Sequence, residues 1–177
     1  MTGAPPTNLA TLRRLFALCC MTTLMTANLA TAQVIGNEAE MDRLQEKAEE
    51  AMASDDPEGA AITMGRAALV AKFLAKTHQE DGSAMRLFQG ADALFRSQEH
   101  SYRAMALFRR AGGQLPVSSG ICGSLSLAQN NVQQALAMLT RESRTPGPRT
   151  VKALSLKQVA ADWETAIDSL IADYQCR

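Results

Sequence analysis

Apolar residues recur every three or four positions along most of this chain, and the clearest case is the stretch 88–116. This spacing places the apolar side chains on one face of an α-helix. We predict two short helices here, joined at Gln98-Glu99-His100 and closed by a left-handed turn at Gly112-Gly113, with Pro116 beyond it. The stripe residues are Phe88, Ala91, Leu94 and Phe95 in the first helix and Ala104, Leu107, Phe108 and Ala111 in the second.

Two helices are predicted before this stretch. Asn37 suits the N-cap of the first, and Glu40 completes a capping box three residues later. Asp56 suits the N-cap of the second and Pro57 its first position, and this helix runs to about residue 75. Ser83 is the predicted N-cap of the helix that follows. The predicted inward residues of the second helix are Ala60, Ala61, Met64, Ala67, Ala68, Ala71 and Leu74.

Three helices are predicted after the stretch. Two lie within residues 117–142 and are joined at Asn130-Asn131, and a linker rich in Pro, Gly and Arg follows at 143–150. The last helix covers residues 155–174, and Trp163 belongs to its apolar stripe. No segment alternates with period two over a useful length, so the predicted fold is all-α.

The first 32 residues have the pattern of a signal peptide. Arg13-Arg14 precede the mostly apolar run 15–29, and Ala30-Thr31-Ala32 has the small-x-small form of a cleavage site. We therefore expect a periplasmic or secreted protein that begins at Gln33. The adjacent arginines are also compatible with a twin-arginine signal, and ordinary and twin-arginine export both remain open.

Composition and cysteine count limit the function of the remaining chain. Without the two arginines of the signal it has sixteen basic against eighteen acidic residues, which argues against a nucleic-acid binder. Cys122 and Cys176 are its only cysteines, and in an oxidising compartment we predict that they form a disulfide. The alternative is two buried thiols.

The central stretch resembles a tetratricopeptide repeat, a helix-turn-helix unit of about 34 residues. Two phenylalanines in the first helix and a small-aromatic-small pattern in the second match that family, although Ala91-Asp92 replaces a large residue followed by Gly. A second copy follows, with its turn at Asn130-Asn131, and a fainter third copy precedes, with its turn at Asp55-Asp56. The matching residues are Phe88, Phe95, Ala104, Phe108, Ala111 and Pro116, then Gly123, Ala135 and Leu139, and, in the early copy, Ala60, Met64 and Ala67.

The resemblance implies an arrangement and a binding mode. Residues 33–150 would form antiparallel helix pairs stacked as a short array, and residues 151–177 a helix that caps its open apolar end. The first helices of such repeats line a groove that binds peptides or protein segments. The implied groove residues are Arg86, Gln89, Ala93 and Arg96 with Asp42, Gln45 and Glu49. The alternative fold is a generic antiparallel helix bundle, which uses the same small and large residues.

Charge is distributed unevenly along the chain. Residues 38–58 hold nine acids against two bases, and residues 86–152 hold nine bases against three acids. Arginines in a groove would suit a partner that carries carboxylates. The alternative is that these charges form two solvated faces.

Residues suited to catalysis are few. His78 and His100 are the only histidines, and both are expected in polar turns. Cys122 lacks a local histidine motif, and the methionines beyond the signal are too far apart in sequence to form a copper site. We predict no enzyme, no metal site and no cofactor.

Two functions remain. The first is a periplasmic interaction module, without catalysis, that docks an envelope protein or peptide through a repeat groove. The second is a periplasmic helical-bundle accessory, such as an assembly chaperone or inhibitor, that uses a surface patch. A third class, a metal or cofactor carrier, would gain from a twin-arginine signal. No stable membrane span is expected after signal cleavage.

Overall fold

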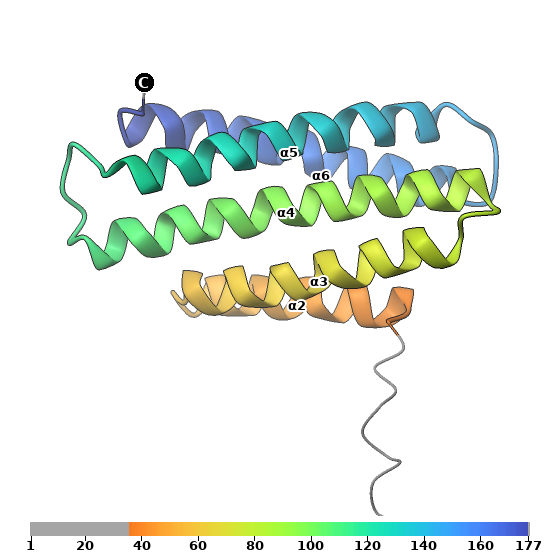
Figure 1. The fold of residues 1–177 in the computed structure, drawn as a ribbon, viewed down its shortest axis with the longest axis horizontal. Helices are drawn as coiled ribbons and strands as arrows, with labels where there is room; N and C mark the ends of the chain where they lie inside the picture. The colour runs from red at the N-terminus through yellow and green to blue at the C-terminus, as the bar shows by residue number, and fades with distance from the viewer. Residues whose placement is uncertain (1–35, 177) are drawn as a thin grey trace, which may run out of the picture. The chain divides into compact units, whose positions relative to one another are not determined.

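The computed structural model describes residues 36–176, which form five α-helices and no strand (Figure 1). The all-α prediction is confirmed. The predicted signal peptide, residues 1–32, lies outside the described residues. The helices are α2 (Glu38–Ala53), α3 (Pro57–Thr77), α4 (Gly82–Arg110), α5 (Ser119–Ser143) and α6 (Thr150–Asp173).

Each helix packs against the next one along the chain, and α4 also contacts α6. Short loops join these helices, so neighbours run antiparallel. Figure 1 shows α3, α4 and α5 side by side, with α2 behind α3 and α6 behind α5. The helix α4 is therefore the central element of the described residues.

The predicted turns at Gln98-Glu99-His100 and Asn130-Asn131 are wrong, because α4 and α5 are each one continuous helix. Some polar residues in the middle of α4 have partners within the helix or on its neighbours, whereas Gln98 Oε1 and His100 Nδ1 are buried without a hydrogen-bond partner among the described residues. Ser97 donates a hydrogen bond of 2.8 Å to the backbone oxygen of Ala128 in α5. Residues 88–111 therefore lie in one helix and its C-cap rather than in a helix pair.

Two of the predicted N-caps are confirmed, although Glu40 does not complete the predicted capping box, because its carboxylate accepts hydrogen bonds from Arg43. The Asn37 side chain accepts a hydrogen bond from the Glu40 amide, and Asp56 caps α3. The predicted cap at Ser83 is wrong, because Asp81 accepts hydrogen bonds from the amides of residues 83 and 84. The predicted stop after α4 is confirmed, since Gly112 and Gly113 have φ angles of +76° and +69°.

Small residues let two helices approach α4 closely. On α3, a Cβ added at Gly65 would lie 3.1 Å from the carboxylate carbon of Glu99. Within α4, a Cβ added at Gly90 would lie 2.8 Å from the side chain of Leu139 in α5. Ala104 is fully buried, as predicted, whereas Ala111 follows the end of α4 and is exposed.

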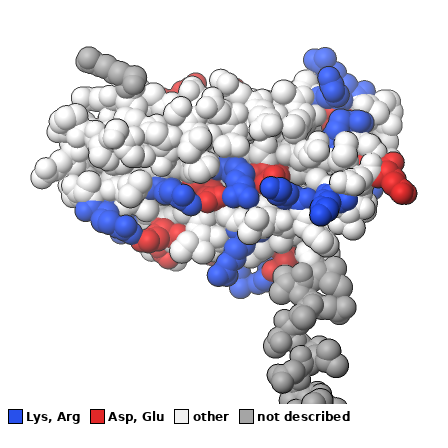
Figure 2. Space-filling model, in the orientation of Figure 1, with Lys and Arg blue, Asp and Glu red and all other residues white. Residues whose placement is uncertain are grey.

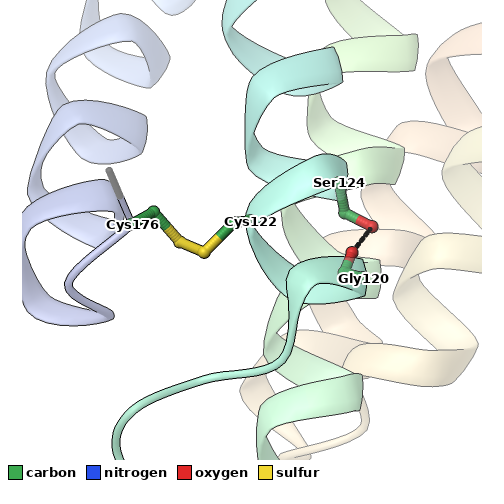
Figure 3. The surroundings of a disulfide bond; sticks show 4 residues. All are labelled: Gly120, Cys122, Ser124 and Cys176. Atoms are coloured by element: carbon green, nitrogen blue, oxygen red, sulfur yellow. Dashed lines mark hydrogen bonds between the residues drawn. A yellow bond between two sulfur atoms is a disulfide. The ribbon is translucent and has the colours of Figure 1, made fainter.

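The C-terminal helix starts five residues earlier than predicted, at Thr150. Trp163, on the predicted apolar stripe of this helix, is half-buried and packs edge-on against Tyr102 of α4, with ring centroids 5.2 Å apart. The predicted disulfide is confirmed: Cys122, near the start of α5, is bonded to Cys176, just beyond α6 (Figure 3). It fastens the end of the chain to α5.

The close approach at Gly90 gives a test of the packing. Gly90→Ala should lower the free energy of unfolding by about 1–3 kcal/mol, because the new methyl group would overlap Leu139. Gly123→Ala is the control, since an added Cβ there meets nothing within 4 Å, and should raise stability by about 0.5–1 kcal/mol through helix propensity. Urea denaturation measures both, and stabilisation by both changes would contradict the packing.

Candidate functional site

The outer face of α3 carries a line of large apolar side chains. Ile62, Leu69 and Phe73 are 56%, 58% and 49% exposed, although each is bulky and apolar. Their spacing of seven and then four residues places them on one stripe of the helix. We call these three residues the α3 stripe. The opposite face of α3 is buried in the core, so this helix is apolar on two sides.

Basic residues flank the α3 stripe on both edges. At about 100° per residue, Arg66 falls on one edge, and Lys72 and Lys76 fall on the other. The second edge faces α4, because both lysines line a shallow pocket with Gln89 of that helix. Among residues 36–176, none of these three cations takes part in an ion pair. The stripe therefore lies between basic side chains, with Asp92 in the same pocket as the two lysines and Glu58 beside Ile62.

A hollow of about 290 Å³ adjoins the stripe at Ile62, between α3 and α4. Its apolar walls come from both helices, and its charged members include Arg103 and the ion pair of Glu58 with Arg110, in which N and O are 2.8 Å apart. The hollow is large enough to hold an apolar side chain from another molecule. Its apolar lining is Ala61, Ile62, Ala106 and Leu107.

Ion pairs occupy much of the charged surface next to the stripe. Figure 2 shows basic and acidic side chains in a row that follows α3 and α4. Glu99, only 7% exposed, lies between Arg96 at 3.1 Å and Arg103 at 2.6 Å. The absence of a side chain at Gly65 makes room for its carboxylate. These arginines are thus neutralised within the chain.

The acidic and basic blocks of the sequence meet in the fold. Arg109 pairs with Asp55 at 2.8 Å, on the loop before α3. Lys152 of α6 pairs with Glu38 of α2 at 2.9 Å. Some of the acidic and basic residues that are separated in the sequence therefore form ion pairs between distant segments of the chain.

Four predicted groove residues lie together. Arg86, Gln89, Ala93 and Arg96 line a furrow between α4 and α5, which Met138 also lines. Two features differ from the expectation. The Arg86 Nε donates to the buried carboxylate of Glu142 at 3.1 Å, and Ala93 is only 6% exposed.

The predicted groove residues of α2 lie elsewhere. Asp42 is 3.5 Å from Lys152 on α6, and Gln45 donates to Glu49 at 3.0 Å along α2. Because α2 packs against α3, whereas the furrow lies between α4 and α5, the two groups do not line one groove. Their role in binding stays a prediction.

The α3 stripe was not recognised from the sequence. The signal was present, because every predicted inward residue of this helix is buried, and the three large apolar residues fall outside that set. A bulky apolar residue on the outer face of an otherwise well-patterned helix indicates a second contact.

His78 lies in the turn between α3 and α4, as predicted, whereas the turn predicted at His100 is wrong. His78 caps the end of α3 and stacks on Phe88, with ring centroids 5.5 Å apart. His100 lies within α4, and its Nδ1 is buried without a hydrogen-bond partner among the described residues. Burial lowers the pKa of His100, while Glu99 acts in the opposite direction and Arg103 and Arg96 reinforce the decrease.

Metal-binding and membrane-spanning features are absent from residues 36–176. Among these residues, no three side chains of His, Cys, Asp or Glu gather as they would around a metal ion. Over the same residues, none of the helices combines the length and apolar character needed to cross a membrane.

Comparison with known proteins gives no family model, no curated protein and no solved structure that matches this chain. The tetratricopeptide-repeat resemblance is therefore an expectation from the residues alone. The evidence on function therefore comes from the surface of this protein itself.

The buried imidazole of His100 predicts a pH effect on stability. Its pKa is lowered on folding, so below the usual histidine pKa of 6.5 the unfolded chain binds a proton that the folded chain does not. The free energy of unfolding should therefore decrease as pH falls from about 7 to about 5. His100→Gln should make this dependence shallower. Denaturant titrations across that range measure the slope, and an unchanged slope in the variant would rule out this assignment.

Proposed function

We propose that this protein is an exported, non-catalytic accessory of the cell envelope that binds a partner protein on the outer face of α3. The observation that carries the proposal is the exposure of Ile62, Leu69 and Phe73 on one stripe. An acidic protein segment is the occupant that the flanking cations favour. This is the surface-patch mode of binding rather than the groove mode.

The energetics support binding at this stripe. Fully burying an exposed large apolar side chain contributes roughly 1.5–3 kcal/mol. About half of that is available at each of these residues, which are 49–58% exposed, so the three together would offset part of the cost of association. The flanking bases add attraction for an acidic partner and discriminate against a basic one. The stripe thus combines a source of affinity with a source of specificity.

Two observations support the proposed location. The apolar run after Arg13-Arg14, with its small-residue cleavage site, is the sequence pattern of an exported protein. The disulfide between Cys122 and Cys176 is of the kind that persists in oxidising compartments. Both fit the periplasm or the medium.

A second candidate function uses the furrow between α4 and α5. Its support is that Arg86, Gln89 and Arg96 lie along it, as the repeat resemblance implies. Both arginines already contact carboxylates of the chain, so a docked acidic peptide would have to compete with them. The α3 stripe needs no such exchange.

Site-specific photocrosslinking in intact cells tests the proposed function. A photoreactive amino acid at position 69 should capture one envelope protein, identified by mass spectrometry, and Phe73→Ser should reduce its yield severalfold because the stripe loses a contact. The same probe at position 158, exposed on α6, is the control, and position 134, exposed on α5, reports on the furrow.

Three outcomes would contradict the proposal. Capture of the same protein at position 158 would show contact without a defined surface. Capture at position 134 but not at position 69 would favour the furrow. Crosslinking only to a second copy of the chain would replace a partner protein by self-association.

A further inference from the structure

We propose that the segment docked on α3 is an acidic amphipathic helix that lies lengthwise along the α3 stripe and inserts one apolar side chain into the hollow beside Ile62. This inference rests on the proposed docking function and specifies the partner's chemistry. It is argued from the geometry of the stripe, its charges and the hollow.

The backbone of α3 favours a helical partner over an extended one. An extended peptide leaves its own amides and carbonyls unpaired unless the surface supplies partners. The exposed middle of α3 supplies none, since its backbone groups are used within the helix. A helical segment satisfies its own backbone and can present an unbroken apolar ridge.

The spacing of the stripe matches such a ridge. From Ile62 to Phe73 is eleven residues, which is roughly 16 Å along the helix axis, or about three turns. Helices dock in this way through anchors that recur every three or four residues. A partner segment of three to four turns would therefore cover all three exposed side chains.

Charge selects an acidic helix. Arg66 lies on one edge of the stripe, and Lys72 and Lys76 lie on the other, so Glu or Asp on both flanks of the partner ridge would meet a base. None of these cations is paired with a carboxylate among the described residues. A second copy that paired α3 with α3 would instead bring like charges together.

The hollow distinguishes a protein segment from a lipid surface. It is concave, holds about 290 Å³ and includes the carboxylate of Glu58 among its lining groups. A single apolar side chain fills such a space, whereas a bilayer surface covers it without filling it. An inserted anchor is the usual centre of a protein interface.

The test uses the purified full chain and a designed probe. The probe is a fluorescent helical peptide of about four turns, with leucines on one stripe and glutamates on both flanks. Fluorescence anisotropy measures its binding, with a lysine-flanked peptide and a scrambled peptide alongside. Anionic phospholipid vesicles are tested by sedimentation, and light scattering reports the oligomeric state.

Two pairs of substitutions locate the probe. Leu69→Ser with Phe73→Ser should weaken binding about tenfold or more, whereas the matched pair Val151→Ser with Leu154→Ser, at exposed apolar positions of α6, should not. Lys72→Gln with Lys76→Gln should weaken it about three- to tenfold and make it less sensitive to salt. The matched charge pair is Arg141→Gln with Arg144→Gln.

Each remaining outcome overturns the inference. If the lysine-flanked peptide binds as tightly as the glutamate-flanked one, the partner need not be acidic. If the matched control pairs weaken binding as much as the test pairs, the peptide does not bind at the α3 stripe. If vesicles bind in a way that needs Leu69 and the peptide does not bind, the α3 stripe is a lipid-binding surface. If the chain forms a dimer that the Leu69→Ser and Phe73→Ser pair abolishes, the stripe binds a second copy of the chain. If the peptide fails but crosslinking at position 69 still captures a partner protein, the inference is wrong and the proposed function stands.

Discussion

The close burial of α4 on two sides is the constraint on which the rest of the structure depends. Helices can approach this closely only where one side of the contact lacks a side chain, and Gly65 on α3 and Gly90 on α4 itself provide those positions. The carboxylate of Glu99 and the side chain of Leu139 occupy the space that results. The polar middle of α4 is part of this packing: Ser97 donates a hydrogen bond to α5 and Glu99 accepts one from Arg103 of the same helix, while Gln98 and His100 each have a buried atom without a partner among the described residues.

This constraint also separates the surfaces of the molecule. The arginines beside α4 hold carboxylates of their own chain, as Arg86 does with Glu142, so that the furrow between α4 and α5 is largely satisfied internally. On α3, by contrast, the core takes one face and leaves Ile62, Leu69 and Phe73 uncovered. The proposed binding surface therefore lies on the face of α3 that does not pack against α4.

Local chemistry was sufficient to predict the all-α class, the caps at Asn37 and Asp56 and the disulfide of Cys122. Local chemistry did not predict the continuous helix at residues 98–100 and 130–131, because a polar run in a turn and a polar run inside a long helix have the same sequence pattern. The partner of Ser97 is 31 residues away, which periodicity does not reveal. The predicted groove residues lie on two faces for the same reason, because grouping those of α2 with those of α4 assumed turns that do not form.

Hydrogen exchange across the middle of α4 tests the continuous, doubly packed helix most directly. Amide-resolved exchange by NMR spectroscopy should find Gln98, Glu99 and His100 as slowly exchanging as Leu94 and Ala104, because all five amides lie in one buried helix. Fast exchange at the first three with protection on both sides would show a turn between two helices. That result would contradict the central role of α4 and restore the helix pair that the sequence suggests.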